Sequence, residues 1–189
     1  MGKHKKTLWP LLVSAVWLGS YIGFSGNAIA QSKVQPLLVS TLYGNIPNVT
    51  IRGVVAGNAP WIVWGHVTLT NNHLSATGKG LIVPVTGYMA NGAAIPKSIA
   101  GTTIGIPTVE AEITFANQKS VITAPVKLNA QGDFTINTSV ALPKNSAQPV
   151  VLIGPGTKSG LKAWFASTDF LMAYGAASKG PSSLSHSSW

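Results

Sequence analysis

The sequence predicts an all-β protein, an antiparallel immunoglobulin-like β-sandwich of about seven or eight strands that is preceded by a signal peptide. Short runs of alternating apolar and polar residues recur at intervals of roughly ten residues. Clusters rich in Gly, Pro and Asn separate these runs, as expected of tight turns. No long stretch after residue 30 keeps the period of an amphipathic helix. The same spacing also occurs in barrels, but we favour the sandwich.

The first thirty residues have the layout of a secretory signal peptide. A basic head with three lysines precedes an uncharged apolar run over residues 8–24 and then Ala28-Ile29-Ala30, a typical peptidase site. We expect cleavage before Gln31 and a secreted or extracytoplasmic protein of the cell envelope. The alternative is an uncleaved anchor, because the run approaches the ~18 residues of a spanning helix. We expect a membrane partner only in that case.

Three regions follow the export segment. Residues 31–47 contain two prolines and one glycine without a sustained period, and we assign them to a linker or an edge segment. Residues 48–168 carry the strand pattern and form the predicted sandwich domain. Residues 169–189 are rich in Ser and Gly and too polar to join a core, so we expect a flexible tail.

The strands are expected, in order, at residues 49–55, 61–70, 80–85, 109–115, 120–128, 134–142, 149–153 and 161–166. In the second of these strands, Gly65 indicates a bulge or a close backbone approach. Pro125 interrupts the fifth strand and indicates an edge or a bulge. Residues 86–108 contain repeated Gly and Pro and form a long connection.

The strand expected at 109–115 alternates cleanly. Its odd-numbered residues are apolar and would face the core, whereas Glu110, Glu112 and Thr114 would face water. Glu110 and Glu112 are also the only close pair of acids, and two carboxylates on one face could hold a cation. No nearby acid completes a ligand set, so we favour a solvent-facing surface.

Residues 53–63, Gly-Val-Val-Ala-Gly-Asn-Ala-Pro-Trp-Ile-Val, resemble the G-V-x-x-G-x-x-P-W-x-V opening of uncharacterised secreted bacterial β-sandwich proteins. In that family a G-L-x-x-P strand follows, which residues 80–84 match. Gly132-Asp133 matches its later hairpin, and residues 149–153 match its P-V-V-L-I strand. The resemblance spans residues 53–166 and implies a sandwich and no reaction. Many of those proteins have cysteines in the later strands, and this chain has none.

Composition excludes several kinds of function. Charged residues make up only 9% of the chain, although the formal net charge is +9. The basic residues after the export segment occur singly rather than in a patch, which argues against nucleic-acid binding. The absence of cysteine excludes disulfides, thiol catalysis and cysteine-ligated zinc or copper. We predict no cofactor.

The residues that could support catalysis form no recognisable constellation. His66 and His73 flank one turn and could approach a transition metal together, but a closed zinc site needs about four ligands. Asp133 could join either histidine and a serine in a triad, yet no G-x-S-x-G elbow is present. Residues 154–160 lack the order of a phosphate loop and are interpreted as a hairpin turn. We therefore do not predict an enzyme.

The candidate ligand-binding residues are Trp61, Trp64, Tyr88 and Trp164, because exposed aromatic rings can stack on sugar rings. Trp61 and Trp64 would point to opposite faces of a regular strand, so at least one of them belongs to the core. Packing in the core is the favoured role of most of these rings.

These observations predict an exported, non-enzymatic interaction module of the surface, envelope or matrix, with an unknown envelope or extracellular partner. The alternative is a carbohydrate- or cell-wall-binding domain whose exposed aromatics hold a polysaccharide. A secreted hydrolase is the second, less favoured alternative. Because the chain has only four acidic residues, we also expect the fold to tolerate acid.

Overall fold

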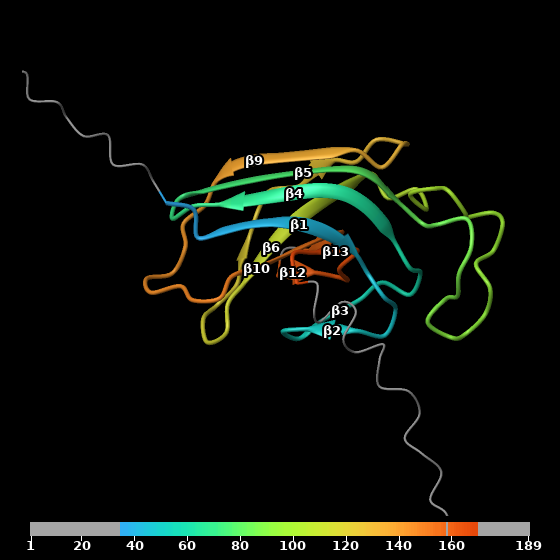
Figure 1. Cartoon of the computed structure of the whole chain (residues 1–189), viewed down its shortest axis with the longest axis horizontal. Helices are drawn as coiled ribbons and strands as arrows, with labels where there is room; N and C mark the ends of the chain where they lie inside the picture. The colour runs from blue at the N-terminus through green and yellow to red at the C-terminus, as the bar shows by residue number, and fades with distance from the viewer. Residues whose placement is uncertain (1–34, 158, 170–189) are drawn as a thin grey trace, which may run out of the picture. The chain divides into compact units, whose positions relative to one another are not determined.

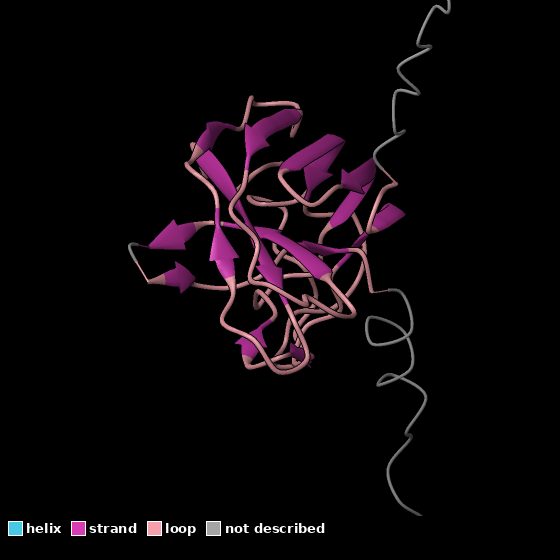
Figure 2. Cartoon of the chain, turned by 90° about the vertical axis from the view of Figure 1, so that its left-hand side faces the viewer, coloured by secondary structure: helices cyan, strands magenta, loops and turns pink. Residues whose placement is uncertain are grey.

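The computed structural model describes residues 35–157 and 159–169. Within these ranges the chain consists of strands, turns and loops without a helix, as Figures 1 and 2 show. The predicted all-β class is therefore confirmed. The signal peptide predicted at residues 1–30 lies outside the described residues, as does all but the first residue of the tail predicted at 169–189.

Thirteen strands form in the described part of the chain, and nine of them belong to one sheet. The strands are β1 (Leu38–Gly44), β2 (Thr50–Ile51), β3 (Val54–Val55), β4 (Ile62–Leu69), β5 (His73–Ile82), β6 (Thr108–Thr114), β7 (Val121–Ile122), β8 (Val126–Lys127), β9 (Phe134–Ser139), β10 (Val150–Gly154), β11 (Gly156–Thr157), β12 (Gly160–Leu161) and β13 (Ala166–Ser167). The remaining strands form two small hairpins, β2–β3 and β11–β12.

The principal sheet is antiparallel and strongly curled. Its strand order is β7-β6-β10-β13-β1-β4-β5-β9, and β8 also pairs with β6. The curl brings β9, at one end of this order, against β6 and β8 at the other. One half of the sheet, β1-β4-β5-β9, therefore lies over the other half, β6-β10-β13 (Figure 1).

The main hydrophobic core fills the space between the two halves. Val67 of β4 and Ile136 of β9 meet Ile113 of β6 and Ile153 of β10 in one buried cluster. Period-2 alternation explains the arrangement, since every second side chain of a strand points to the same face. The odd-numbered residues of the segment 109–115 are all buried, as predicted.

A second, smaller core lies on the other face of β10. The β2–β3 hairpin places Ile51 against Leu152 of β10 and against Trp164. Because β10 is covered on both faces, all five of its residues are buried. This burial explains why the segment is a continuous apolar run rather than an alternating one.

The range 31–47, expected to be a linker or an edge segment, contains a strand at the centre of the sheet. Strand β1 pairs with β4 on one side and with β13 on the other. Leu42 points into the core and is 1% exposed. At the end of the strand, Gly44 lets the Trp61 carbonyl approach so closely that a Cβ would overlap it. The flanking prolines, which suggested a linker, lie outside the strand.

The single strand expected at 49–55 is a hairpin. Arg52 and Gly53 connect β2 to β3, with φ angles of 48° and 86°. Two successive residues with positive φ are typical of the type I′ turn that joins antiparallel strands. The sequence pattern of alternating apolar residues does not show such a reversal, because the turn is only two residues long.

In place of the strand expected at 80–85, the structure has β5, which begins at His73 and ends at Ile82. Strand β5 starts at His73, directly after the Asn71-Asn72 turn, where the Thr70 N–H donates to the His73 carbonyl at 2.9 Å. The close backbone approach predicted at Gly65 is confirmed, since a Cβ there would overlap the Thr77 carbonyl of β5. The bulge itself lies one step away, between Ile62 and Trp64.

The last expected strand, 161–166, divides into β12 and β13. Between them the Trp164 N–H donates to the Val55 carbonyl at 3.0 Å, and the Gly57 N–H donates to the Trp164 carbonyl at 3.0 Å. This exchange ties Trp164 to the β2–β3 hairpin and to the residues that follow it, while Phe165 and Ala166 are bonded to β10 of the sheet. The hairpin turn predicted at 154–160 is confirmed by the pairing of β11 with β12, and the division of 120–128 at Pro125 is confirmed by β7 and β8.

Candidate functional site

The outward-facing side chains of β1, β4, β5 and β9 form a polar surface, here called the outer face. Strand register places four of its residues in one row: Thr41, His66, Thr77 and Thr135. A second row contains Val39, Thr68, Ser75 and Asn137. Seven of these eight side chains can donate or accept hydrogen bonds, so the face offers an array of polar groups on a rigid sheet.

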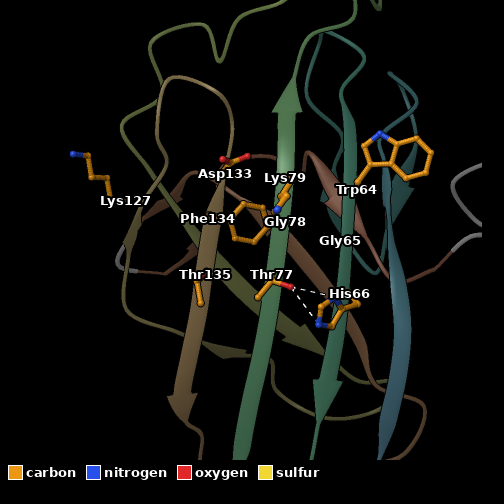
Figure 3. A pocket seen from close by; sticks show the side chains of 10 residues that line it. All are labelled: Trp64, Gly65, His66, Thr77, Gly78, Lys79, Lys127, Asp133, Phe134 and Thr135. Atoms are coloured by element: carbon orange, nitrogen blue, oxygen red, sulfur yellow. Dashed lines mark hydrogen bonds between the residues drawn. The ribbon is translucent and has the colours of Figure 1, made fainter.

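A groove of about 660 Å³ crosses one end of the outer face (Figure 3). Trp64 borders it on one side and Lys127 on the other, and His66, Thr77 and Lys79 lie between them. The groove therefore combines an aromatic ring, hydroxyl and imidazole groups, and two cationic side chains. Concave sites with a few convergent polar groups are the usual location of ligands.

Trp64 is the most exposed large apolar side chain in the described part of the chain, at 81%. It also borders a second depression of about 320 Å³, together with Thr41, Tyr43 and Ile62. The indole thus forms a ridge between two adjoining hollows. The β-bulge between Ile62 and Trp64 directly precedes the exposed indole in β4.

The histidines of the outer face have hydroxyl and amide partners. The ring nitrogens of His66 lie 3.2 and 3.3 Å from Thr77 Oγ1, and His73 Nε2 lies 2.6 Å from Asn137 Oδ1. Among the described residues, neither histidine makes a hydrogen bond with a carboxylate or a serine. Both side chains belong to the polar surface rather than to a triad.

Asp133 is held by the loop that precedes β9. Its Oδ1 accepts a hydrogen bond from the Gly80 N–H at 3.1 Å, and its Oδ2 accepts one from Asn129 Nδ2 at 3.3 Å. The Asp133 N–H in turn donates to Asn129 Oδ1 at 2.7 Å. Both carboxylate oxygens are thus used to fix the loop at the edge of the groove. The aspartate positions backbone rather than a catalytic histidine.

The expectation that Glu112 and Thr114 face water is wrong. Glu112 is 6% exposed and Thr114 is 3% exposed. The β11–β12 hairpin packs over this face of β6, and Glu112 Oε2 accepts a hydrogen bond from the Leu161 N–H at 2.9 Å. The sequence pattern missed this burial because it assumed that only one face of β6 is covered.

Glu110 lies under the same hairpin, against Gly156, where a Cβ would overlap its carboxylate. Desolvation at this position raises the pKa of Glu110 above its ordinary value of 4.5. Glu110 and Glu112 do share a face, as their spacing predicts, but one of them accepts a backbone hydrogen bond. In residues 35–157 and 159–169, no group of three or more His, Cys, Asp or Glu side chains is placed to hold a metal ion.

The other candidate aromatics lie elsewhere. Trp61 is 3% exposed and stacks on Phe165 with a centroid distance of 4.1 Å, and Trp164 is fully buried in the second core. Neither ring can offer a face to a ligand. Tyr88 is 70% exposed, but it borders a separate depression on the long connection, next to Val85. Of the four candidates, only Trp64 lies in the groove on the outer face.

Sequence reasoning did not find Lys79, Lys127 and Thr77 as groove residues. Thr77 and Lys79 lie on the first part of β5, which was not predicted as a strand, and Lys127 meets them only through the pairing of strands, which the sequence pattern does not give. The available signal was the recurrence of Thr, Ser, Asn and His at alternate positions of 66–68, 75–77 and 135–137.

Comparisons of the chain with models of known protein families, with curated proteins and with solved structures find no match. Within the described ranges, the chain has no helix of the length and apolar character needed to cross a bilayer.

Proposed function

We propose that this chain is an exported, non-enzymatic binding protein of the cell envelope or extracellular space that holds a carbohydrate on the outer face. In this proposal residues 1–30 direct export, and the curled sheet is an immunoglobulin-like β-sandwich. The observation that supports it best is Trp64, 81% exposed between two hollows of a polar sheet surface. Burial of apolar surface stabilises a fold, so an exposed indole contributes little to the stability of this one, and its exposure is better explained by binding.

The surroundings of Trp64 favour a sugar over a protein partner. Stable protein interfaces have an apolar centre that excludes water. On the groove side of Trp64, by contrast, the neighbours are His66, Thr77 and Lys79, and the apolar Ile62 and Val63 border only the second hollow. A pyranose ring matches this combination, since its C–H face can lie on the indole while its hydroxyl groups bond to polar side chains at the rim.

The experiment that tests this function is retention of the purified protein on insoluble polysaccharides and isolated cell walls. We expect Trp64→Ala to weaken binding about tenfold or more, as is typical of a central tryptophan. Its side chain is exposed, so the fold should be unaffected. Tyr88→Ala is the matched control, because it removes an aromatic ring of similar exposure from a different depression.

The control variant should bind within twofold of wild type, on the order of 0.4 kcal/mol. Equal binding by wild type and Trp64→Ala would contradict the proposal. Loss of binding only in Tyr88→Ala would also contradict it, because the ligand would then bind at the connection between β5 and β6.

A further inference from the structure

We propose that the carbohydrate is anionic, and that Lys79 and Lys127 recognise carboxylate or phosphate groups along it. This inference rests on the function proposed above and adds the chemical class of the ligand. It starts from the position of the two cations. Lys79 lies directly opposite Trp64 in the pairing of β4 with β5, and Lys127 closes the far side of the groove from β8 (Figure 3).

Both ammonium groups are available to a ligand. Lys79 and Lys127 are exposed, and neither forms an ion pair within residues 35–157 and 159–169. Lys79 and Lys127 are far apart in the sequence, and the short loop from β8 to β9 together with the pairing of β9 with β5 places both at one groove. Two unpaired cations flanking one groove create a local positive potential even though the basic residues are scattered along the chain.

The acidic residues do not cancel this potential. Asp133 is the only carboxylate that lines the groove, where its single negative charge is outnumbered by the charges of Lys79 and Lys127, and both of its oxygens accept hydrogen bonds from the neutral donors of Gly80 and Asn129. Glu110 and Glu112 lie on β6 beneath the β11–β12 hairpin. The groove therefore has an excess of positive charge that is free to meet an anion.

The positions of the groove residues indicate which part of such a ligand each side chain would bind. Trp64 provides a surface for one sugar ring, and His66 and Thr77 provide hydrogen-bonding groups beside it. A charged substituent on that ring or on its neighbour would meet Lys79, and a second substituent further along the chain would meet Lys127. A uronic acid supplies a carboxylate and a phosphorylated sugar supplies a phosphate, and a lysine binds either as a point charge.

The test compares binding of the purified protein to polygalacturonate, to fully methyl-esterified polygalacturonate and to a phosphomannan, whose sugar rings carry phosphate groups. Esterification removes the charge and keeps the sugar backbone. We expect wild type to prefer a charged polymer to the esterified one by about tenfold at low salt, with the preference shrinking as salt is added. Preference for the first or the last polymer identifies carboxylate or phosphate as the group recognised.

The paired variant Lys79→Gln/Lys127→Gln should lose this preference and still bind the esterified polymer. The matched control is Lys97→Gln/Lys119→Gln, which removes the same charge from exposed lysines outside the groove. Equal loss in the control pair would overturn the inference, because net charge alone would then explain the preference. Binding to vesicles of anionic phospholipid but to no polymer would overturn it as well.

The two proposals fail in different ways. If wild type binds the esterified and charged polymers equally, and Trp64→Ala abolishes both, the carbohydrate function stands and the anionic class is wrong. If wild type binds a charged polymer and Trp64→Ala does not change that binding, the aromatic site of the proposed function is wrong.

Discussion

Trp61, which directly precedes β4, and Trp64, three positions later in β4, lie in opposite environments. Trp61 is stacked on Phe165 in the core, and Trp64 is exposed on the outer face. The odd spacing places their side chains on opposite faces of the extended chain. The core ring is explained by packing alone, so the exposed ring is the one that needs an explanation in function.

Gly78 of β5 determines how closely the groove floor is packed. A Cβ at this position would overlap the ring of Phe134 on β9. We expect Gly78→Ala to lower the free energy of unfolding by about 1–3 kcal/mol, because the buried ring must shift in a filled core. Chemical denaturation measures the effect.

Ser75→Ala, in the same strand, is the control and should change the free energy of unfolding by less than about 0.5 kcal/mol. Adding Phe134→Leu to Gly78→Ala should cost less than the sum of the two single losses, because the smaller side chain removes the overlap. Strictly additive losses would show that the ring is not the cause.

At the scale of elements, the β2–β3 hairpin covers one face of β10 and depends on its turn. Gly53 has φ 86°, and a Cβ there would meet nothing within 4 Å. Gly53→Ala should therefore cost about 1 kcal/mol through backbone strain alone. Asn tolerates positive φ, so Gly53→Asn should cost clearly less when both variants are measured by thermal unfolding. Equal losses in the two variants would argue against a strained turn.

Alternation along a single segment is enough to predict some elements and not others. It located β4, β6 and β9 because each has one face on the core and keeps the period-2 pattern over six or more residues. It missed β1, which has no sustained alternation of apolar and polar residues and lies between prolines, and it missed the turn at Arg52 and Gly53. The groove was not predictable either, because its residues come from β4, β5, β8 and β9 and meet only through the pairing of these strands, which alternation along one segment does not give.

At the scale of the molecule, the curl of one sheet encloses the main core, and the groove lies on the outer face of one half of the sheet. The curl places β6 and β10 beneath β4 and β5. The same curl leaves the far face of β6 and β10 to be covered by the two small hairpins. Glu110 is partly buried as a result, and this burial has a consequence for the dependence of stability on pH.

Desolvation raises the pKa of Glu110 in the folded state. The folded protein therefore holds this proton more firmly than the unfolded chain does, and protonation stabilises the fold. The contribution is fully present below a pH of about 4.5, the ordinary pKa of the group, and is lost as pH rises through the folded-state value. Stability from this residue thus increases on acidification, in the direction expected for a chain with only four acidic residues.

Comparison with Glu110→Gln isolates this contribution, because glutamine keeps the shape of the side chain and does not titrate. The free energy of unfolding of both proteins should be measured by denaturation from about pH 4 to about pH 7. We expect wild type to lose stability relative to Glu110→Gln as the pH rises through this range. The two proteins differ only at residue 110, so the difference between their curves reports on Glu110. Parallel curves would show that the β11–β12 hairpin does not desolvate Glu110, and a difference of opposite sign would require an ion partner for its carboxylate.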